Sequence, residues 1–163
     1  GSGERPVGGR KRIGFISGPA DSSTGRERLA GYRRAMAEAG VPVSEELIRY
    51  GDFKQASGRT LALDLLALAA PPSALFVSNN LMMIGALEAI SAQQLRIPEQ
   101  VGIVGFDDLP LAAVFNPPLT VVRQPAYEAG RSAAELLFKR IEDPTRPATS
   151  LKLLPELVIR GSG

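Results

Sequence analysis

Polar side chains that could bind a ligand follow the apolar runs expected to form strands of a parallel sheet. The clearest run, from Val101 to Phe106, is rich in β-branched residues and ends in the carboxylates Asp107 and Asp108. A short, almost unbroken apolar run is typical of a strand buried on both faces of a parallel sheet. Ligands of such sheets bind at the edge formed by the carboxyl ends of the strands. We therefore expect the functional site at the carboxyl end of this strand.

Other expected strands are also followed by residues that could contact a ligand. These are Asp21, Ser22, Ser23, Thr24 and Arg28 after the first strand, Asp52 and Phe53 after the second, Ser78 and Asn79 after the third, and Gln124 after the fifth. They should converge on one edge of the sheet. Some have alternative explanations: Ser23 and Asn80 are expected to cap helices, and Phe53 is either part of the core or a stacking platform. Arg28 lies on the surface or pairs with a ligand or with Asp107.

Several kinds of chemistry are excluded by residues that the chain lacks. Its 163 residues include no Cys and no His, which removes thiolate nucleophiles, Cys-ligated zinc and the commonest general base. A Ser-His-Asp or Cys-His triad is therefore impossible. The first strand-end loop, GPADSSTG, lacks the Gly-Lys-Ser/Thr ending of a phosphate-binding loop, and no Gly-x-Gly-x-x-Gly follows a strand.

The paired carboxylates Asp107 and Asp108 do not indicate a metal site. Neighbouring side chains on an extended chain point to opposite faces, so these two should not share one ion. We therefore expect no catalytic residue, no metal and no cofactor. The polar residues suit a hydroxyl-rich or small polar ligand instead.

Charge and hydropathy indicate no nucleic-acid surface or membrane segment. The net charge is only +2, and the densest basic cluster, Arg10-Lys11-Arg12, is three residues long. A nucleic-acid face needs a longer stripe of Lys and Arg. No apolar run approaches the roughly 20 residues that a membrane span requires.

The alternation of strands and helices predicts an α/β fold with a mostly parallel sheet. Strands are expected at residues 13–16, 47–50, 74–77, 101–106, 119–123 and 151–159, and helices at 26–39, 57–70, 81–95 and 127–142. The architecture is a flavodoxin-like or Rossmann-like three-layer sandwich. Pro155 predicts an edge position for the last strand, because proline cannot donate a ladder hydrogen bond. Residues 1–9 are interpreted as a tag and leader, and residues 10–163 as one domain.

Five segments along the chain form a specific combination of motifs. In order, they are GRKRIGFISGP, TGRERLAGYRRAMAEAG, ALFVSNNLMMIGALEAI, VGIVGFDD and LTVVRQPAYEAGRSAAELL. Together they resemble the lac-repressor (LacI/GalR) family of bacterial transcription regulators, from about residue 10 to residue 160. The resemblance implies the C-terminal lobe of a two-lobed, periplasmic-binding-protein-like effector core. The helix-turn-helix headpiece, the hinge and most of the N-terminal lobe have no counterpart here.

The resemblance also implies which residues contact the effector. The matching positions are Ser22, Thr24, Arg28, Phe53, Asn79, Asp107 and Gln124. Arg28 lies in the RLAGY motif and Asp107 in GFDD, whereas Ser22 is a variable position. Asn80 departs from the pattern, because the family usually has Asp there. Asn can still cap a helix, so only the local electrostatics differ.

We therefore expect a non-enzymatic, cytoplasmic effector-sensing lobe of a transcription regulator. Its effector would be a sugar, a polyol or a nucleobase-like molecule, and it would contact DNA only through the absent headpiece. One alternative is a lobe of a periplasmic-type sugar-binding protein, which a signal peptide on the full gene would indicate. The other is an enzyme domain on a flavodoxin-like or Rossmann-like sheet, which the missing His, Cys and phosphate loops disfavour.

Two expectations concern assembly, and one concerns affinity. The apolar helix 81–95 and the apolar stretch 109–115 predict a homodimer, because together they would form a large exposed patch. In the family, the counterpart of helix 127–142 packs on the other lobe. Here this helix is expected to fold back onto its own sheet or to exchange between two chains. The chain should bind effector only weakly, because one wall of the cleft is missing.

Overall fold

The computed structural model describes residues 12–163, so the expected tag and leader at residues 1–9 lies outside the described residues. These residues form one six-stranded sheet with the strand order β2-β1-β3-β4-β5-β6. The strands are β1 (Ile13–Ser17), β2 (Ile48–Tyr50), β3 (Ala74–Val77), β4 (Gly102–Phe106), β5 (Thr120–Arg123) and β6 (Glu156–Val158). The first five are parallel, and β6 runs antiparallel to β5 at the edge. The prediction of a mostly parallel sheet with an edge strand after Pro155 is confirmed.

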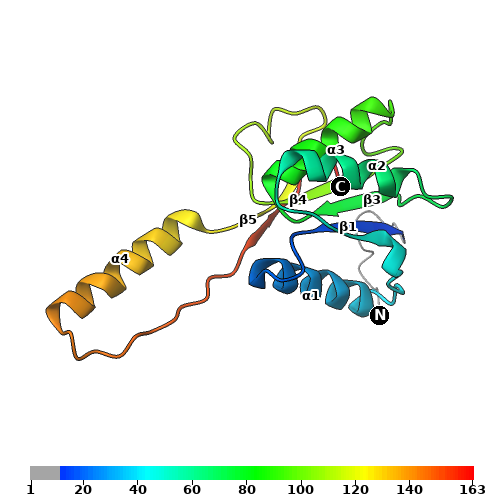
Figure 1. The fold of residues 1–163 in the computed structure, drawn as a ribbon. Coiled ribbons are helices and arrows are strands. Elements are labelled where there is room, and N and C mark those ends of the chain that lie inside the picture. Colours follow the sequence, from blue (N-terminus) through cyan, green and yellow to red (C-terminus); the bar gives the residue numbers. More distant parts are fainter. Residues whose placement is uncertain (1–11) are drawn as a thin grey trace.

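Helices cover the two faces of the sheet unequally (Figure 1). The helices are α1 (Ser23–Glu38), α2 (Gln55–Leu66), α3 (Asn80–Ala92) and α4 (Ala126–Glu142), and a short 3-10 helix, η2 (Glu45–Leu47), precedes β2. α1 lies on one face, against β1, whereas α2 and α3 lie side by side on the other face. The predicted three layers are therefore present around β1 and β3.

Each face of the sheet has its own apolar core. On the α1 face, the Phe15 ring stacks on Tyr32 and Phe76 with centroids 4.9 and 5.4 Å apart. On the other face, α2 and α3 contact each other closely through Gly58 and Gly85. A Cβ at Gly85 would lie 2.1 Å from the Gln55 carbonyl oxygen, so only glycine permits this approach. The apolar circumference of α3 is thus buried by α2 as well as by the sheet.

Two helices end earlier than the periodicity predicts. α2 ends at Leu66 rather than at residue 70, and beyond its end the Ala70 carbonyl oxygen accepts a hydrogen bond from Arg12 (2.6 Å). α3 ends at Ala92 rather than at residue 95. There Gln94 adopts a left-handed conformation (φ 54°), and the Leu95 amide donates to the Ile90 carbonyl oxygen. Glycine is usual at such a position, so the sequence does not signal the end of α3.

The segment from α4 to β6 departs most from expectation. No residue of α4 is buried, and the helix projects from the body while residues 143–155 return beside it (Figure 1). The prediction that α4 folds back onto its own sheet is therefore wrong. Leu136 instead lines a groove together with Leu151 and Leu153 of the returning segment. The predicted strand 151–159 shortens to Glu156–Val158 for the same reason: its first half accompanies α4 and not the sheet.

Candidate ligand-binding site

The residues expected to bind a ligand follow the carboxyl ends of five adjacent strands. In the order of the sheet they are Phe53 after β2, Ser22, Thr24 and Arg28 after β1, Asn79 after β3, Asp107 after β4, and Gln124 after β5. This arrangement follows from the parallel topology, which places all five loops at one edge. The side chains of these residues nevertheless have different structural roles.

Arg28 joins α1 to the strand ends beneath it. Its Nη1 donates a hydrogen bond to the Ser78 carbonyl oxygen, and its guanidinium carbon lies 3.9 Å from the centroid of the Phe106 ring. Partial burial lowers the pKa of the Arg28 guanidinium, and the Asp107 carboxylate offsets part of that effect. Arginine remains charged under such conditions. The side chain is thus a cation held between the Ser78 carbonyl oxygen and the Phe106 ring, and within residues 12–163 it forms no ion pair with Asp107.

Asp107 is held in an uncommon backbone conformation at the end of β4. Its φ is 75°, and its amide donates to the Val122 carbonyl oxygen at 2.8 Å. A non-glycine residue at positive φ persists only where its surroundings hold it there. Gln124 Nε2 also donates to the Asp107 carboxylate. The structure therefore brings together Arg28, Asp107 and Gln124.

Asn79 and Phe53 form a second group at the same edge. Asn79 Oδ1 accepts from the Met82 amide (3.0 Å), which caps α3, and Nδ2 donates to the Phe53 carbonyl oxygen (2.8 Å). Phe53 has a φ of 67°, and its ring lies directly over Gly18. A Cβ at Gly18 would come within 2.1 Å of that ring, so the contact requires glycine. Phe53 thus covers the end of β1 and packs against the apolar core, as the core alternative from the sequence predicts.

Ser22 and Thr24 are placed less favourably for ligand contact. Ser22 Oγ accepts from the Gly25 amide (2.9 Å) and donates to the Pro19 carbonyl oxygen (3.1 Å), so it caps α1. The caps of α1 and α3 are therefore Ser22 and Asn79, and the expectation of Ser23 and Asn80 is wrong by one residue. The cause is that each helix begins earlier than its apolar periodicity does. Thr24 is exposed on the first turn of α1.

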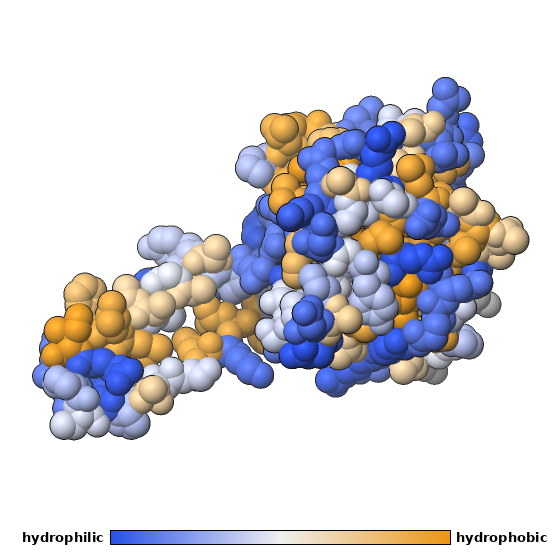
Figure 2. Space-filling model, in the orientation of Figure 1, coloured by the Kyte–Doolittle hydropathy of each residue, from blue (hydrophilic) through white to orange (hydrophobic). Residues whose placement is uncertain are grey.

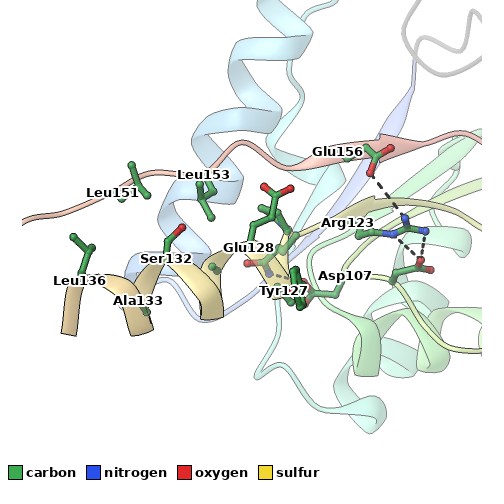
Figure 3. Close-up of a pocket in the computed structure, with 15 residues that line it drawn as sticks. Asp107, Arg123, Tyr127, Glu128, Ser132, Ala133, Leu136, Leu151, Leu153 and Glu156 are labelled. Carbon is green, nitrogen blue, oxygen red and sulfur yellow. Dashed lines mark hydrogen bonds and ion pairs between the residues drawn. The ribbon is translucent and has the colours of Figure 1, made fainter. Parts of the chain in front are cut away.

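Two grooves lie beside these residues. The first runs over the sheet face next to α1 and contains Thr24, Arg28 and Gln124. The second lies between the strand ends and α4 and contains Asp107 and Gln124 (Figure 3). Neither groove contains Ser22, Phe53 or Asn79. The structure thus brings the predicted residues to one edge without enclosing them in one cavity.

A cluster of charges next to the site was not predicted. Asp108 accepts from Arg123 (2.8 Å) and Arg160 (3.2 Å). Arg123 also lies 3.9 Å from Glu156 (Figure 3). The hydrogen bond from Arg160, followed by that from Arg123, lowers the pKa of Asp108, although burial opposes the shift. Asp107 and Asp108 thus have separate partners. No local pattern indicates the pairing of Asp108 with Arg160, because 52 residues separate them.

Two other kinds of site, a membrane-spanning helix and a metal centre, are absent from residues 12–163. No helix there is long and apolar enough to cross a membrane. The same part of the chain contains no group of three or more Asp and Glu residues arranged to hold a metal ion.

Comparisons with known proteins place the chain in a family. A model described as "Periplasmic binding protein-like domain" matches residues 8–163. The chain is 37% identical over 154 residues to the HTH-type transcriptional repressor PurR of Photobacterium profundum, covering 94% of this chain and 46% of that protein. It therefore spans about half the length of this relative.

Solved structures agree with this match. The transcriptional regulator CelR in complex with cellobiose superposes with a TM-score of 0.88 at 41% identity, over 96% of this chain and 48% of that one. A LacI-family regulatory protein from Chloroflexus aggregans gives a TM-score of 0.88 at 38% identity, over 94% and 56%. These relatives are transcription regulators rather than enzymes. The chain therefore belongs to the family of periplasmic binding protein-like domains, in the form found in LacI-type transcription regulators.

Proposed function

We propose that this chain is the effector-sensing lobe of a bacterial transcription regulator and has no catalytic activity. The effector is a small, hydroxyl-rich molecule such as a sugar. It binds at the carboxyl edge of the sheet, where Arg28 and Asp107 hydrogen-bond to its hydroxyl groups. The observation that carries the proposal is the assembly of Arg28, Asp107 and Gln124 by contacts that cross from α1 to β4 and β5.

The chemistry of this group suits a sugar. A carboxylate accepts from two neighbouring hydroxyls, and a guanidinium donates to ring or hydroxyl oxygens, so a cation and an anion at the same sheet edge match alternating donors and acceptors. The Phe53 platform offers an apolar ring face, such as the C–H face of a sugar requires. Asn79 has one unused amide hydrogen for the ligand. Ser22 and Thr24 are proposed as peripheral contacts at the start of α1.

The proposed affinity of the isolated lobe is low. Its polar groups lie in open grooves, where water competes for each hydrogen bond and the net gain is only about 0.5–1.5 kcal/mol per bond. A second lobe that excluded water would strengthen these contacts. If that lobe contributed about 4 kcal/mol, a micromolar site would become roughly millimolar here.

Calorimetric titration tests the site directly. The chain is titrated with cellobiose, ribose, polyols and purines, beside variants Asp107→Ala and Asp143→Ala. Asp143 lies on the surface after α4, so it is a matched control. We expect roughly millimolar binding of one sugar, abolished in D107A and unchanged in D143A. Micromolar binding would contradict the proposed weakness. Binding that survives in D107A would contradict the proposed site.

The remaining parts of the proposal concern the whole regulator. Residues 10–163 are proposed as the C-terminal lobe of its effector core, consistent with a match to less than half of PurR. DNA would be contacted by a helix-turn-helix encoded elsewhere in the same gene, and the protein would act in the cytoplasm. The sequence of the upstream gene region tests this, because a secretory signal there would favour the periplasmic alternative.

A homodimer is also proposed. Exposed apolar side chains remain at the start of α3 and in the loop before β5, namely Leu81, Leu111, Val114 and Phe115. Burying them against a second copy would remove apolar surface from water. Light scattering of the Leu111→Ser/Val114→Ser variant is expected to show weaker association than the unmodified chain does. Equal masses of the variant and the unmodified chain at all concentrations would rule out this surface as the dimer interface.

A further inference from the structure

The charge cluster of Asp108, Arg123 and Arg160 lies where the chain leaves the sheet for α4 and returns from it. β5 ends at Arg123, and β6 begins at Glu156 on the neighbouring strand. Figure 2 shows hydrophilic side chains on the body where the projecting part of the molecule joins it. Asp108 is also the next residue after Asp107, to which the proposed effector binds. The cluster is therefore placed to affect that site without touching the effector.

The Asp108 carboxylate has its hydrogen-bonding capacity taken up by two guanidinium groups. Its Oδ2 accepts from Arg123 Nε (3.0 Å) and Nη2 (2.8 Å) and from Arg160 Nη2 (3.3 Å), and its Oδ1 accepts from Arg160 Nη1 (3.2 Å). The side chains of Asp108 and Arg160 are only 23% and 15% exposed. Planar guanidinium forks fix the orientation of a carboxylate as well as its position. Asp108 is therefore held in one orientation and is not available to a ligand.

The last residues of the chain hold Arg160 in place. Its Nη1 donates to the Leu119 carbonyl oxygen (2.7 Å), and its amide donates to Thr120 Oγ1 (2.9 Å). Two residues later, the buried Ser162 Oγ accepts from the Thr120 amide (2.8 Å) and donates to the Ile103 carbonyl oxygen (2.7 Å). The segment is thereby bound to both β4 and β5. The Arg160 guanidinium thus reaches the cluster from a fixed backbone.

Asp107 is the residue that needs such support. Its φ of 75° lies in the left-handed region, which is disfavoured for any residue with a Cβ. Its own contacts are a hydrogen bond from its amide to the Val122 carbonyl oxygen (2.8 Å) and one from Gln124 to its carboxylate. The carboxylate of the next residue is held much more firmly. If Asp108 were released, the backbone at Asp107 could return to negative φ, and its carboxylate would then point elsewhere.

We propose that Asp108 is a positioning residue of the effector site. Its hydrogen bonds to Arg123 and Arg160 keep the backbone of Asp107 in the conformation that presents the Asp107 carboxylate to the effector. The C-terminal residues 160–162 thereby contribute to the site although they do not contact the effector. The effector role of Asp107 rests on the proposed function, whereas the support of Asp107 by Asp108 is a property of the chain without ligand.

Amide hydrogen exchange of the ligand-free chain, followed by NMR, tests the support directly. Asp108→Asn retains the shape of the side chain and removes its charge. The Asp107 amide is expected to exchange at least about tenfold faster in this variant, while the amides of β3 change much less. Glu38→Gln, which breaks the exposed pair of Glu38 with Arg34, is the matched control and should change neither. Unchanged exchange at Asp107, or equal acceleration at Asp107 and in β3, would overturn the proposal.

Two further variants show whether Arg160 acts through Asp108. Arg160→Met should also accelerate exchange of the Asp107 amide, but adding it to Asp108→Asn should produce little further change, because the pair is already broken. Asp108→Glu keeps a carboxylate and should restore exchange to within about threefold of the unmodified chain. Fully additive effects of the two single variants, or no rescue by glutamate, would contradict positioning through this carboxylate.

Titration with cellobiose and with ribose, followed through the Asp107 and Asn79 amide signals, connects the support to binding. Asp108→Asn is expected to raise the dissociation constant of the sugar that binds at least about threefold, and Glu38→Gln should leave it unchanged. Equal affinity despite faster exchange at Asp107 would overturn the role of Asp108 in the site. Failure of the unmodified chain to bind either sugar would count against the proposed function, whereas the exchange results would still decide whether Asp108 holds Asp107.

Discussion

The two halves of the sheet are covered in different ways. β1 and β3 carry apolar side chains that are buried under α1 on one face and under α2 and α3 on the other. β4 and β5 are buried on the α3 side, whereas a groove runs over the other face of β4, β5 and β6, and α4 covers neither face. The first half is therefore the part of the sheet that helices cover on both faces. The second half presents the charged site residues and the unpartnered apolar surfaces, so it is the half available for binding.

The largest expected contrast comes from the same substitution in the two halves. Leu75→Ala in β3 removes a side chain that is 1% exposed and should lower the free energy of unfolding by about 2–5 kcal/mol. Leu137→Ala in α4 should change it by no more than about 0.5 kcal/mol. Urea denaturation at a fixed, low protein concentration measures both. Equal losses would show that α4 belongs to the cooperative core.

Two helical glycines provide a second contrast. Gly85→Ala forces a Cβ against the Gln55 carbonyl oxygen of α2 and should destabilise the chain by about 1–3 kcal/mol. The Cβ of Gly130→Ala would meet nothing within 4 Å. The substitution should therefore lower the free energy of forming α4 by up to about 1 kcal/mol and raise its helix content. Denaturation and circular dichroism report the two effects. A neutral Gly85→Ala would mean that α2 and α3 are not in close contact.

Asp108 joins Arg123 of β5 to Arg160 after β6. Its contribution to the free energy of unfolding should depend on pH. Asp108→Asn weakens the pairs with Arg123 and Arg160, and at neutral pH it should cost about 1–2 kcal/mol, because the carboxylate is partly exposed. The folded pKa of Asp108 is lowered, so its contribution is complete above the unfolded pKa of about 3.9 and is lost as pH falls through the folded value.

Urea titrations of wild type and D108N at a series of pH values check this. The stability gap between them should stay constant from neutral pH down to about 5 and close below about 4. If the stability difference between wild type and D108N instead disappeared between neutral pH and about 5, a group other than Asp108 would be responsible for it.

The smallest expected effect concerns helix capping. α1 begins with a side-chain cap, whereas the N-cap of α4, Pro125, makes no side-chain cap hydrogen bond. Ser22→Ala should therefore cost about 1 kcal/mol, and Ser22→Asp should retain the cap. Ser23→Ala, one residue further on, is the matched control and should be close to neutral. If Ser23→Ala lost more stability than Ser22→Ala, Ser23 would be the N-cap of α1, as the sequence alone predicts.

Much of the sheet could be predicted because its signals are local. The apolar run at residues 74–77 matches β3 residue for residue, and Pro155 correctly indicated an edge strand. Helix ends were less predictable. The left-handed Gln94 and the contact from Arg12 to Ala70 depend on distant or unusual backbone geometry, which apolar periodicity does not encode.

The sequence by itself determined the α/β class, the parallel strands and the edge at which Arg28, Asn79, Asp107 and Gln124 meet. Short, almost unbroken apolar runs and period-3.6 apolar patterns carry that information, and parallel topology brings the loops together. Only the tertiary structure decided that Ser22 caps α1, that Asp108 pairs with Arg160, and that α4 leaves the body. The pairing of Asp108 with Arg160 depends on groups that meet across 52 residues, whereas the Ser22 cap depends on where the backbone of α1 begins. For α4, the amphipathic pattern predicts that one side of the helix packs on an apolar surface. It does not identify that surface.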